Sequence, residues 1–259
     1  MVDDKNWTSS FEETFATPVS LVMERIWQEV LGSEYLEGLD AFSYISVTEL
    51  RRFADEVQVG ADQYLVDIGC GRGGPGLWVA AMTGARLIGI DVADSALAAA
   101  RRRADEVGLA GRAEYRRGSF EDTDLSDRSA NAVMSVDALL FSPDKSAAIV
   151  EMARIIVPGG RLVLTSWDYH SQPGGLPSQV DDHRPLLTEA GFDLLNYEET
   201  AAWRERIQQT NLGLLAAVDE LAVEFGADPA EIKESILEMD ATFAHMSRRV
   251  LLVARRRTG

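Results

Sequence analysis

The sequence contains a single cysteine, Cys70, and only three histidines among its 259 residues. One cysteine excludes an internal disulfide and fits a reducing compartment, so we expect a cytoplasmic protein. No His/Cys/carboxylate cluster has the spacing of metal ligands, and we therefore expect no metal site. No apolar run approaches the roughly 20 residues of a membrane span, and the polar, acidic start is unlike a signal peptide.

Basic residues are also scarce. The chain has 25 lysines and arginines against 42 acids, which gives a formal net charge of −17. Such a charge repels phosphate backbones, so we expect no nucleic-acid partner and a small molecule as substrate. At 46% hydrophobic residues the chain can bury a full core, as a monomer or a homodimer.

The stretch from residue 64 to residue 79 organises the rest of the chain. An apolar run passes into a glycine-dense turn and then into a second apolar segment, which predicts a strand, a tight loop and a helix. Gly69, Gly71 and Gly73 allow positive φ angles or close approach of a ligand to the backbone. Two ligands fit the glycine spacing. Gly69-x-Gly71-x-x-Gly74 suits a dinucleotide, whereas Gly69-x-Gly71-x-Gly73 suits S-adenosylmethionine (SAM).

The neighbouring motifs favour the second ligand. Asp67 completes the pattern Asp-x-Gly-x-Gly-x-Gly, which resembles motif I of class I SAM-dependent methyltransferases. A second predicted strand, residues 87–91, ends in Asp91, and an acid at that place suits ribose hydroxyls. The sequence Pro158-Gly159-Gly160 resembles the lead-in to the fifth strand of these enzymes.

The resemblance extends over most of residues 17–257. The strings at residues 70–78, 182–187 and 248–256 resemble small-molecule methyltransferases of actinobacterial type, which often serve natural-product pathways. This resemblance implies an α/β, Rossmann-like class I methyltransferase fold. Its mostly parallel sheet would have seven strands with helices on both faces, an N-terminal helical cap and a helical insertion before the last strand.

We expect one methyltransferase domain over residues 1–259, divided into four parts. Residues 1–58 would form an N-terminal arm and a helical cap, and residues 59–200 the SAM-binding core. Residues 201–247 would form an insertion of two helices, and residues 248–259 the last strand with a basic tail. Residues 1–16 lack an evident period and are expected to be a mobile arm, although Phe11 and Phe15 could dock on the rest of the protein. Thr17-Pro18 predicts the first helix start.

The resemblance also assigns the cofactor site. The glycine loop would surround the methionyl part of SAM, Asp91 would bind the ribose, and the turn after the third strand would hold the adenine. S-adenosylhomocysteine would be the product. The predicted cofactor residues are Asp67, Gly69, Cys70, Gly71, Gly73, Asp91, Val92, Ser119, Phe120, Glu121, Val136 and Asp137.

Acceptor and catalytic residues are harder to predict. A hydroxyl acceptor benefits from a general base, and His170, just past the fifth predicted strand, is the best-placed histidine. Asp137 and Asp168 are further candidates, whereas the histidine that the family usually has after the fourth strand is replaced by Phe141. The predicted acceptor residues are Trp27, Tyr44, Phe141, Trp167, Met239 and Phe243.

The second helix of the insertion carries a regular apolar stripe, formed by Ile232, Ile236, Met239, Phe243 and Met246. Such a stripe needs an apolar partner, which could be the other helix, a second subunit or the substrate.

The predicted function is transfer of the methyl group of SAM to a small, partly apolar acceptor. The expected acceptor group is a hydroxyl, with a carbon atom or an amine as the alternatives. Two alternatives stay open, namely a SAM-fold cyclase that transfers no methyl group and a non-catalytic SAM-binding regulator.

Overall fold

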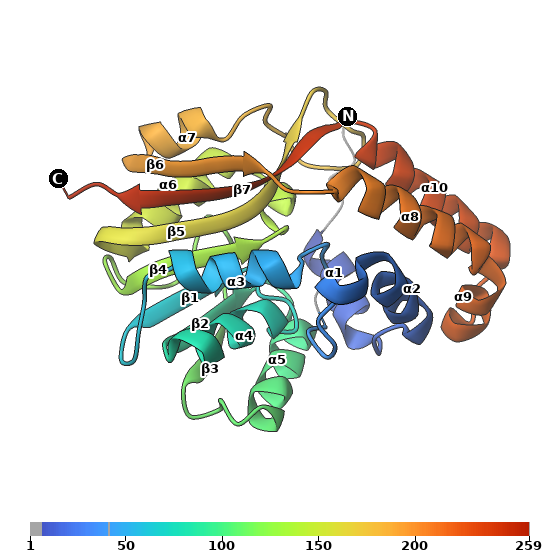
Figure 1. Ribbon diagram of the computed structural model, residues 1–259, viewed down its shortest axis with the longest axis horizontal. Helices are drawn as coiled ribbons and strands as arrows, with labels where there is room; N and C mark the ends of the chain where they lie inside the picture. The colour runs from blue at the N-terminus through green and yellow to red at the C-terminus, as the bar shows by residue number, and fades with distance from the viewer. Residues whose placement is uncertain (1–6, 41, 259) are drawn as a thin grey trace.

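The computed structural model describes residues 7–40 and 42–258, and a seven-stranded sheet forms the centre of this part of the chain (Figure 1). The strand order is β3-β2-β1-β4-β5-β7-β6. Neighbours from β3 to β5 run parallel, and β7 is antiparallel to both β5 and β6. The strands are β1 (Tyr64–Ile68), β2 (Arg86–Asp91), β3 (Ala113–Arg117), β4 (Ala130–Val136), β5 (Ile156–Tyr169), β6 (Phe192–Glu199) and β7 (Met246–Arg256). This topology confirms the predicted Rossmann-like methyltransferase fold.

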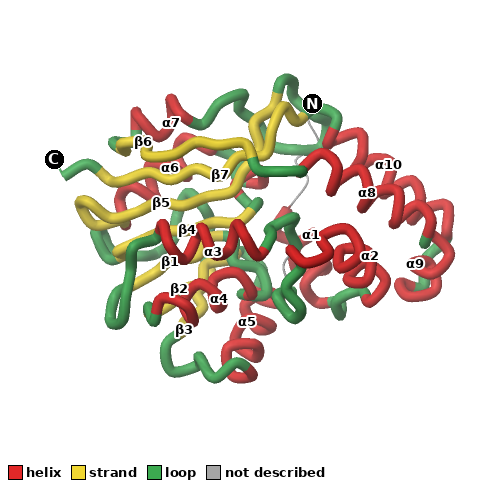
Figure 2. The backbone as a smooth tube through the Cα atoms, in the orientation of Figure 1, coloured by secondary structure: helices red, strands yellow, loops and turns green. Residues whose placement is uncertain are grey.

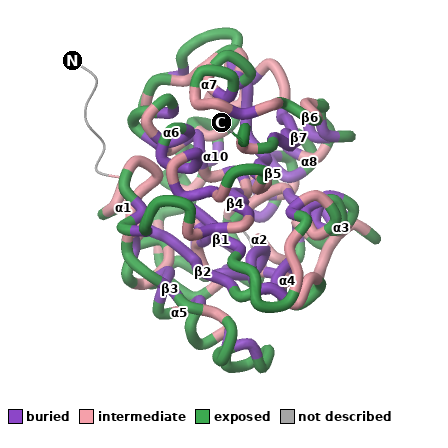
Figure 3. The backbone as a smooth tube through the Cα atoms, turned by 90° about the vertical axis from the view of Figure 1, so that its left-hand side faces the viewer, coloured by how far each residue is buried: buried purple, intermediate pink, exposed green. Residues whose placement is uncertain are grey.

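Side chains alternate between the two faces of the sheet, as the pleat of a strand requires. On one face the core includes Leu65, Leu87 and Val163, which pack with helices α3 (Val47–Glu56), α4 (Gly74–Thr83) and α5 (Asp94–Glu106). The opposite face includes Val66, Ile88 and Leu164, packed with α6 (Lys145–Ile155) and α7 (Arg184–Glu189). The buried segments in Figure 3 accordingly follow β1, β2 and β4 through the middle of the molecule.

A separate group of helices lies at the carboxyl-terminal ends of the parallel strands (Figures 1 and 2). It contains α1 (Trp7–Ala16), α2 (Leu21–Leu31), the 3₁₀ turn η1 (Gly32–Glu34), α8 (Trp203–Ala216), α9 (Val218–Phe225) and α10 (Pro229–Phe243). No helix of the described residues is long and apolar enough to cross a membrane.

The insertion contains three helices where the sequence predicted two, because the first helical stretch is broken at Ala217. Its apolar partner within the chain is α2. Ile26 of α2 packs with Leu214, Leu221 and Ile236. Gly213 permits this close approach, since a Cβ there would lie 2.8 Å from Cγ2 of Ile26. The apolar stripe is therefore largely internal core.

The N-terminal part differs most from the prediction. Residues 7–16 form helix α1, so the expected mobile arm is wrong over these residues, and residues 1–6 lie outside the described part. The missed signal is the spacing of four between Trp7, Phe11 and Phe15, which places three aromatic rings on one helical face. The next helix begins after Ser20, whose side chain accepts a hydrogen bond from the Met23 N–H, and not at Thr17-Pro18.

Strand β5 is longer than predicted. It continues through Trp167, Asp168 and Tyr169, because these residues pair with β7. All three side chains are buried. The sequence predicts a fifth strand over residues 161–166 with Trp167, Asp168 and Tyr169 leaving its end beside the reacting methyl group, whereas the structure places these three residues in the sheet.

Candidate active site

A cavity of about 790 Å³ lies beyond the carboxyl-terminal ends of the parallel strands. Ligands of open α/β sheets bind at this edge, and the volume falls in the usual range for small-molecule sites. Four groups of residues line it. They are the glycine loop after β1, the turns that follow β2, β3 and β4, helix α1 with Asp40, Phe42 and Ser43, and the segment from Gln172 to Ser178.

The glycine loop has almost no room for side chains. Gly69 and Cys70 donate backbone N–H groups to the Ile90 carbonyl at 2.8 and 3.0 Å, which ties the loop to β2. Gly69 has a φ of 71°, and a Cβ there would lie 2.6 Å from Cβ of Ala138. Helix α4 then begins directly after Gly73 and directs its first N–H groups toward the loop. Bare backbone therefore faces the cavity.

Asp67 lies beneath this loop. Its carboxylate occupies the space where a side chain at position 76 would be, since a Cβ on Gly76 would lie 2.5 Å from Oδ2. Burial, with a smaller contribution from the charge of Asp91, raises the pKa of Asp67 to about 8. Asp67 is therefore largely protonated at neutral pH and can donate a hydrogen bond.

This raised pKa predicts a pH-dependent stability. The folded, unliganded protein holds a proton on Asp67 that the unfolded chain releases above pH 4. We therefore expect the free energy of unfolding to fall between about pH 4 and pH 8, by up to about 1.4 kcal/mol per pH unit for this proton. Asp67→Asn should flatten that slope in urea titrations, whereas Asp181→Asn on the surface should not. Equal slopes in the parent and Asp67→Asn would refute the assignment.

Asp91 joins the glycine loop to the start of α5. Its Oδ2 accepts the Gly71 N–H at 2.8 Å, and its Oδ1 accepts the Ala93 N–H at 3.0 Å. The side chain is buried, and burial raises its pKa. A carboxylate has about four lone-pair sites, so it can accept further hydrogen bonds from hydroxyl groups in the cavity.

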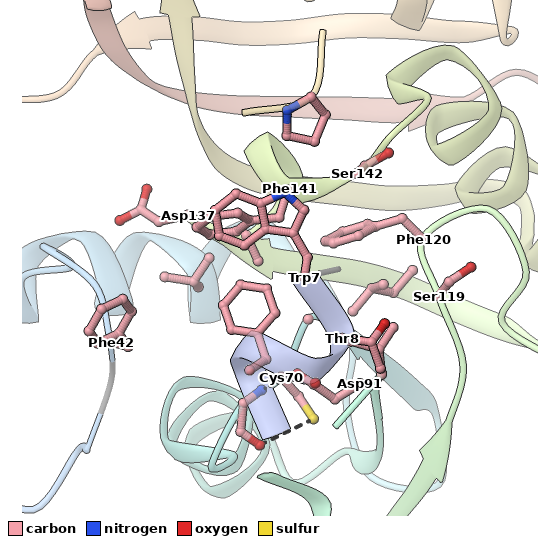
Figure 4. A pocket seen from close by; sticks show the side chains of 18 of the residues that line it. Trp7, Thr8, Phe42, Cys70, Asp91, Ser119, Phe120, Asp137, Phe141 and Ser142 are labelled. Atoms are coloured by element: carbon pink, nitrogen blue, oxygen red, sulfur yellow. Dashed lines mark hydrogen bonds between the residues drawn. The ribbon is translucent and has the colours of Figure 1, made fainter. Parts of the chain in front are cut away.

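The turn after β3 forms another wall. Ser119 Oγ accepts hydrogen bonds from the N–H groups of Glu121 and Asp122 at 3.2 and 3.1 Å. Glu121 accepts a short hydrogen bond from Ser142 Oγ, which joins this turn to the one after β4. In Figure 4, Ser119 and Phe120 lie at one end of the cavity, and Phe42 and Asp137 lie at the other.

Eleven of the twelve predicted cofactor residues line this cavity. The exception is Gly73, which instead caps α4 with a φ of 82°. Cys70 lines the cavity, but burial raises the pKa of its thiol well above the usual value, so the thiol is a poor nucleophile.

Asp137, which follows β4, is held by a buried arginine. Its carboxylate accepts hydrogen bonds from Nε and a terminal nitrogen of Arg249, both at 2.9 Å, and from Ser43 Oγ at 2.7 Å. Arg249 is fully buried and also donates to Glu49 at 2.6 Å and to Thr200 at 3.2 Å. Asp137 has a φ of 50°, in the left-handed region that aspartate adopts more readily than most residues. These contacts fix the turn and occupy both oxygens of the carboxylate.

Helix α1 covers the cavity. The rings of Trp7 and Phe11 each lie 4.8 Å from the ring of Phe141. Phe15 lies over the glycine loop, where a Cβ on Gly71 would be 3.4 Å from its Cζ. None of the residues of α1 is fully buried, so the helix packs as an outer layer.

Glu12 anchors this helix to α5. Its carboxylate accepts the Ser95 N–H at 3.1 Å, and Ser95 Oγ donates to the Glu12 carbonyl at 2.9 Å. Glu12→Ala removes an acceptor at a helix N-terminus, where such contacts contribute about 0.5–2 kcal/mol. We expect amide hydrogen exchange in α1 to accelerate by about 2- to 30-fold. Glu13→Ala, which changes an exposed neighbour, is the control, and equal protection in both variants would remove Glu12 as the anchor.

The predicted acceptor residues do not all meet in the cavity. Phe141 lines it, whereas Tyr44, Trp167 and Phe243 pack against one another with ring centroids 6.0–6.4 Å apart. Trp27 lines a smaller neighbouring pocket of about 140 Å³. Met239 packs in the core between α2 and the insertion.

Two of the predicted bases lie outside the lining of the cavity. His170 is exposed, and its Nε2 and Nδ1 lie 3.0 Å from the Ala244 carbonyl and from Ser171 Oγ. Asp168 is fully buried and contacts His183, Tyr197 and Arg248 at 2.6–2.8 Å. No histidine is found among the described residues that line the cavity.

Comparisons with known proteins agree with this geometry. A family model described as a methyltransferase domain matches residues 66–164. The chain is 26% identical over 190 residues to methyltransferase GfsG of Streptomyces halstedii, covering 67% of each protein. It is 25% identical over 199 residues to 27-O-demethylrifamycin SV methyltransferase of Amycolatopsis mediterranei (strain S699), covering 70% of this chain and 73% of that protein. The [4+2]-cyclase SpnF superposes with a TM-score of 0.74 at 22% identity, covering 97% of both chains.

Proposed function

We propose that this chain, which carries a methyltransferase domain in the Rossmann-like fold of class I methyltransferases, is a SAM-dependent methyltransferase acting on a small, partly apolar acceptor in secondary metabolism. The similarity to GfsG and to 27-O-demethylrifamycin SV methyltransferase supports the link to secondary metabolism. The observation that carries the proposal is the continuous cavity wall formed by the glycine loop, Asp91 and the turn from Ser119 to Glu121.

The residues of this wall suit SAM. A side chain at position 69 would collide with Ala138, so the loop can contact a ligand there only through its backbone. Asp91 is positioned for the ribose hydroxyls, and Phe120 offers an apolar surface for the adenine beside the polar groups of Ser119 and Glu121. The acids of the cavity favour a positively charged sulfonium. When bound, SAM supplies a methyl group on a sulfonium, which is already a good leaving group.

The protein's contribution is then alignment and exclusion of water. Trp7, Phe11 and Phe141 form an aromatic cover that keeps water from one part of the cavity. Asp137, which accepts hydrogen bonds from Arg249 and from Ser43, shapes the opposite wall. Because Asp137 is already paired and His170 lies outside the lining, we assign no general base. This arrangement favours an acceptor whose nucleophilic atom needs little activation.

A cyclase that retains the cofactor is the second candidate. It is favoured by the full-length similarity to the [4+2]-cyclase SpnF and by the lack of a free base in the described lining. A non-catalytic SAM-binding regulator is the third.

Mass spectrometry of reaction products separates these functions. The protein is incubated with SAM that carries a deuterated methyl group and with a panel of apolar amines, alcohols and alkenes that includes polyenes able to cyclise. A methyltransferase adds one deuterated methyl group to its acceptor. A cyclase changes the fragmentation of a substrate without changing its mass, and a regulator changes neither. Failure of SAM to bind in calorimetry would overturn the proposal for all three.

A further inference from the structure

Positive charge is nearly absent from the described lining of the cavity. Arg72 is its one cationic side chain. The acids are Asp40, Asp67, Asp91, Glu121 and Asp137. Even with Asp67 protonated, acids outnumber cations, so the potential in the cavity disfavours a bound anion.

Both terminal nitrogens of Arg72 contact other protein groups. One terminal nitrogen pairs with Asp40 at 3.1 Å, and the other donates to the Thr17 carbonyl at 2.6 Å. Its guanidinium also lies over the ring of Phe15, 5.4 Å from the centroid. Turning Arg72 toward a ligand would break the contacts that hold α1 in place.

The part of the cavity opposite Ser119 is built for an apolar molecule. Figure 4 shows Phe42 on the side away from Ser119, and the lining of the cavity also includes Trp7, Phe141 and Leu176. Phe42 is 54% exposed, which places it where the cavity meets solvent. Arg249 pairs with both Asp137 and Glu49, so this group has no spare positive charge for an anionic ligand. Placing a phosphate or carboxylate here would bury a charge without a partner, which is costly.

We propose that the acceptor is an uncharged, largely apolar molecule that enters past Phe42, and that anionic acceptors such as prenyl diphosphates are rejected. This inference rests on the proposed function, because the glycine-loop side of the same cavity is assigned to SAM. It goes further by giving the chemical class of the molecule on the other side.

Two fluorescent dyes with the same ring skeleton test this inference. N-phenyl-1-naphthylamine is neutral, and 8-anilinonaphthalene-1-sulfonate carries one negative charge. Calorimetry first measures binding of S-adenosylhomocysteine, and the dyes are then titrated into the loaded protein. We expect the neutral dye to bind at least about tenfold more tightly than the anionic dye. A tenfold ratio of dissociation constants corresponds to the cost of one unsatisfied buried group.

A charge-adding variant locates the effect. Phe42→Arg places a cation at the proposed entrance. It should strengthen binding of the anionic dye and so reduce the ratio of the two dyes' affinities. Val223→Arg, at an 85% exposed position on α9, should leave the ratio unchanged. The inference would be overturned if the parent protein bound the anionic dye as tightly as the neutral dye or more tightly. It would also be overturned if Phe42→Arg left the ratio of the two affinities unchanged. Absence of S-adenosylhomocysteine binding would instead count against the proposed function.

Discussion

Asp91→Ala is expected to weaken SAM binding by about 10- to 150-fold. The substitution removes the carboxylate that we propose accepts hydrogen bonds from the ribose hydroxyls, and a hydrogen bond to a charged group contributes about 1.5–3 kcal/mol. It also releases the Gly71 N–H, which Asp91 Oδ2 holds at 2.8 Å, so the glycine loop loses part of its support. Isothermal titration calorimetry measures the change in dissociation constant directly.

Two variants sharpen this experiment. Asp91→Asn keeps the size and one acceptor oxygen, so its affinity should fall between those of the parent and Asp91→Ala. Asp94→Ala, three residues later on the exposed face, should bind SAM as the parent does. An unchanged affinity in Asp91→Ala would exclude the ribose assignment, whatever the effect on catalysis.

Arg249→Met is expected to lower the free energy of unfolding by about 3–5 kcal/mol. Removing one partner of a buried ion pair leaves uncompensated charge, and in this protein two carboxylates, Asp137 and Glu49, would be left. Methionine is shorter than arginine but similar to it in volume and uncharged, so the loss is electrostatic more than volumetric. Urea unfolding followed by circular dichroism provides the measurement.

The control for this variant is Arg25→Ala. Arg25 pairs with Glu220 at 2.9 Å, but both side chains are at least half exposed, so the expected loss is at most about 1 kcal/mol. Adding Asp137→Asn to Arg249→Met should recover part of the stability, because one of the two unpaired charges is removed. A loss in Arg249→Met no larger than in Arg25→Ala would show that the network contributes little to stability.

The cofactor side of the site could be predicted because its chemistry is local. Gly69, Gly71 and Asp91 fall within one stretch of 23 residues, in which the glycines follow the first strand and Asp91 ends the second. Their order and spacing carry the information, so eleven of the twelve predicted residues line one cavity.

The acceptor side could not be predicted in the same way, because its determinants are distant in sequence. Asp137 and Arg249 are separated by 112 residues, and no local pattern joins them. The sequence predicts that Trp167 leaves the end of the fifth strand near the cavity. Pairing of β5 with β7 instead places Trp167 in the sheet. The spacing of Trp7, Phe11 and Phe15 predicts a helix with three aromatic rings on one face. In the structure this face lines the cavity.

The histidine prediction illustrates a related limit. His170 follows the fifth strand, where a base could reach a substrate, but its orientation depends on the end of the insertion. There the Ala244 carbonyl lies 3.0 Å from Nε2, and the adjacent His245 contacts Ser171 Oγ at 2.8 Å. A position along the chain predicts which edge of a sheet a residue approaches, but not the direction of its side chain.

The central claim is that one cavity holds SAM along the glycine loop and leaves its other end for an apolar acceptor. A crystal structure of the protein with S-adenosylhomocysteine tests this most directly. We predict ribose hydroxyls within hydrogen-bonding distance of Asp91, the adenine beside Phe120, and the sulfur directed toward the side of the cavity that contains Phe141. A ligand bound elsewhere, or bound with the ribose away from Asp91, would contradict the account.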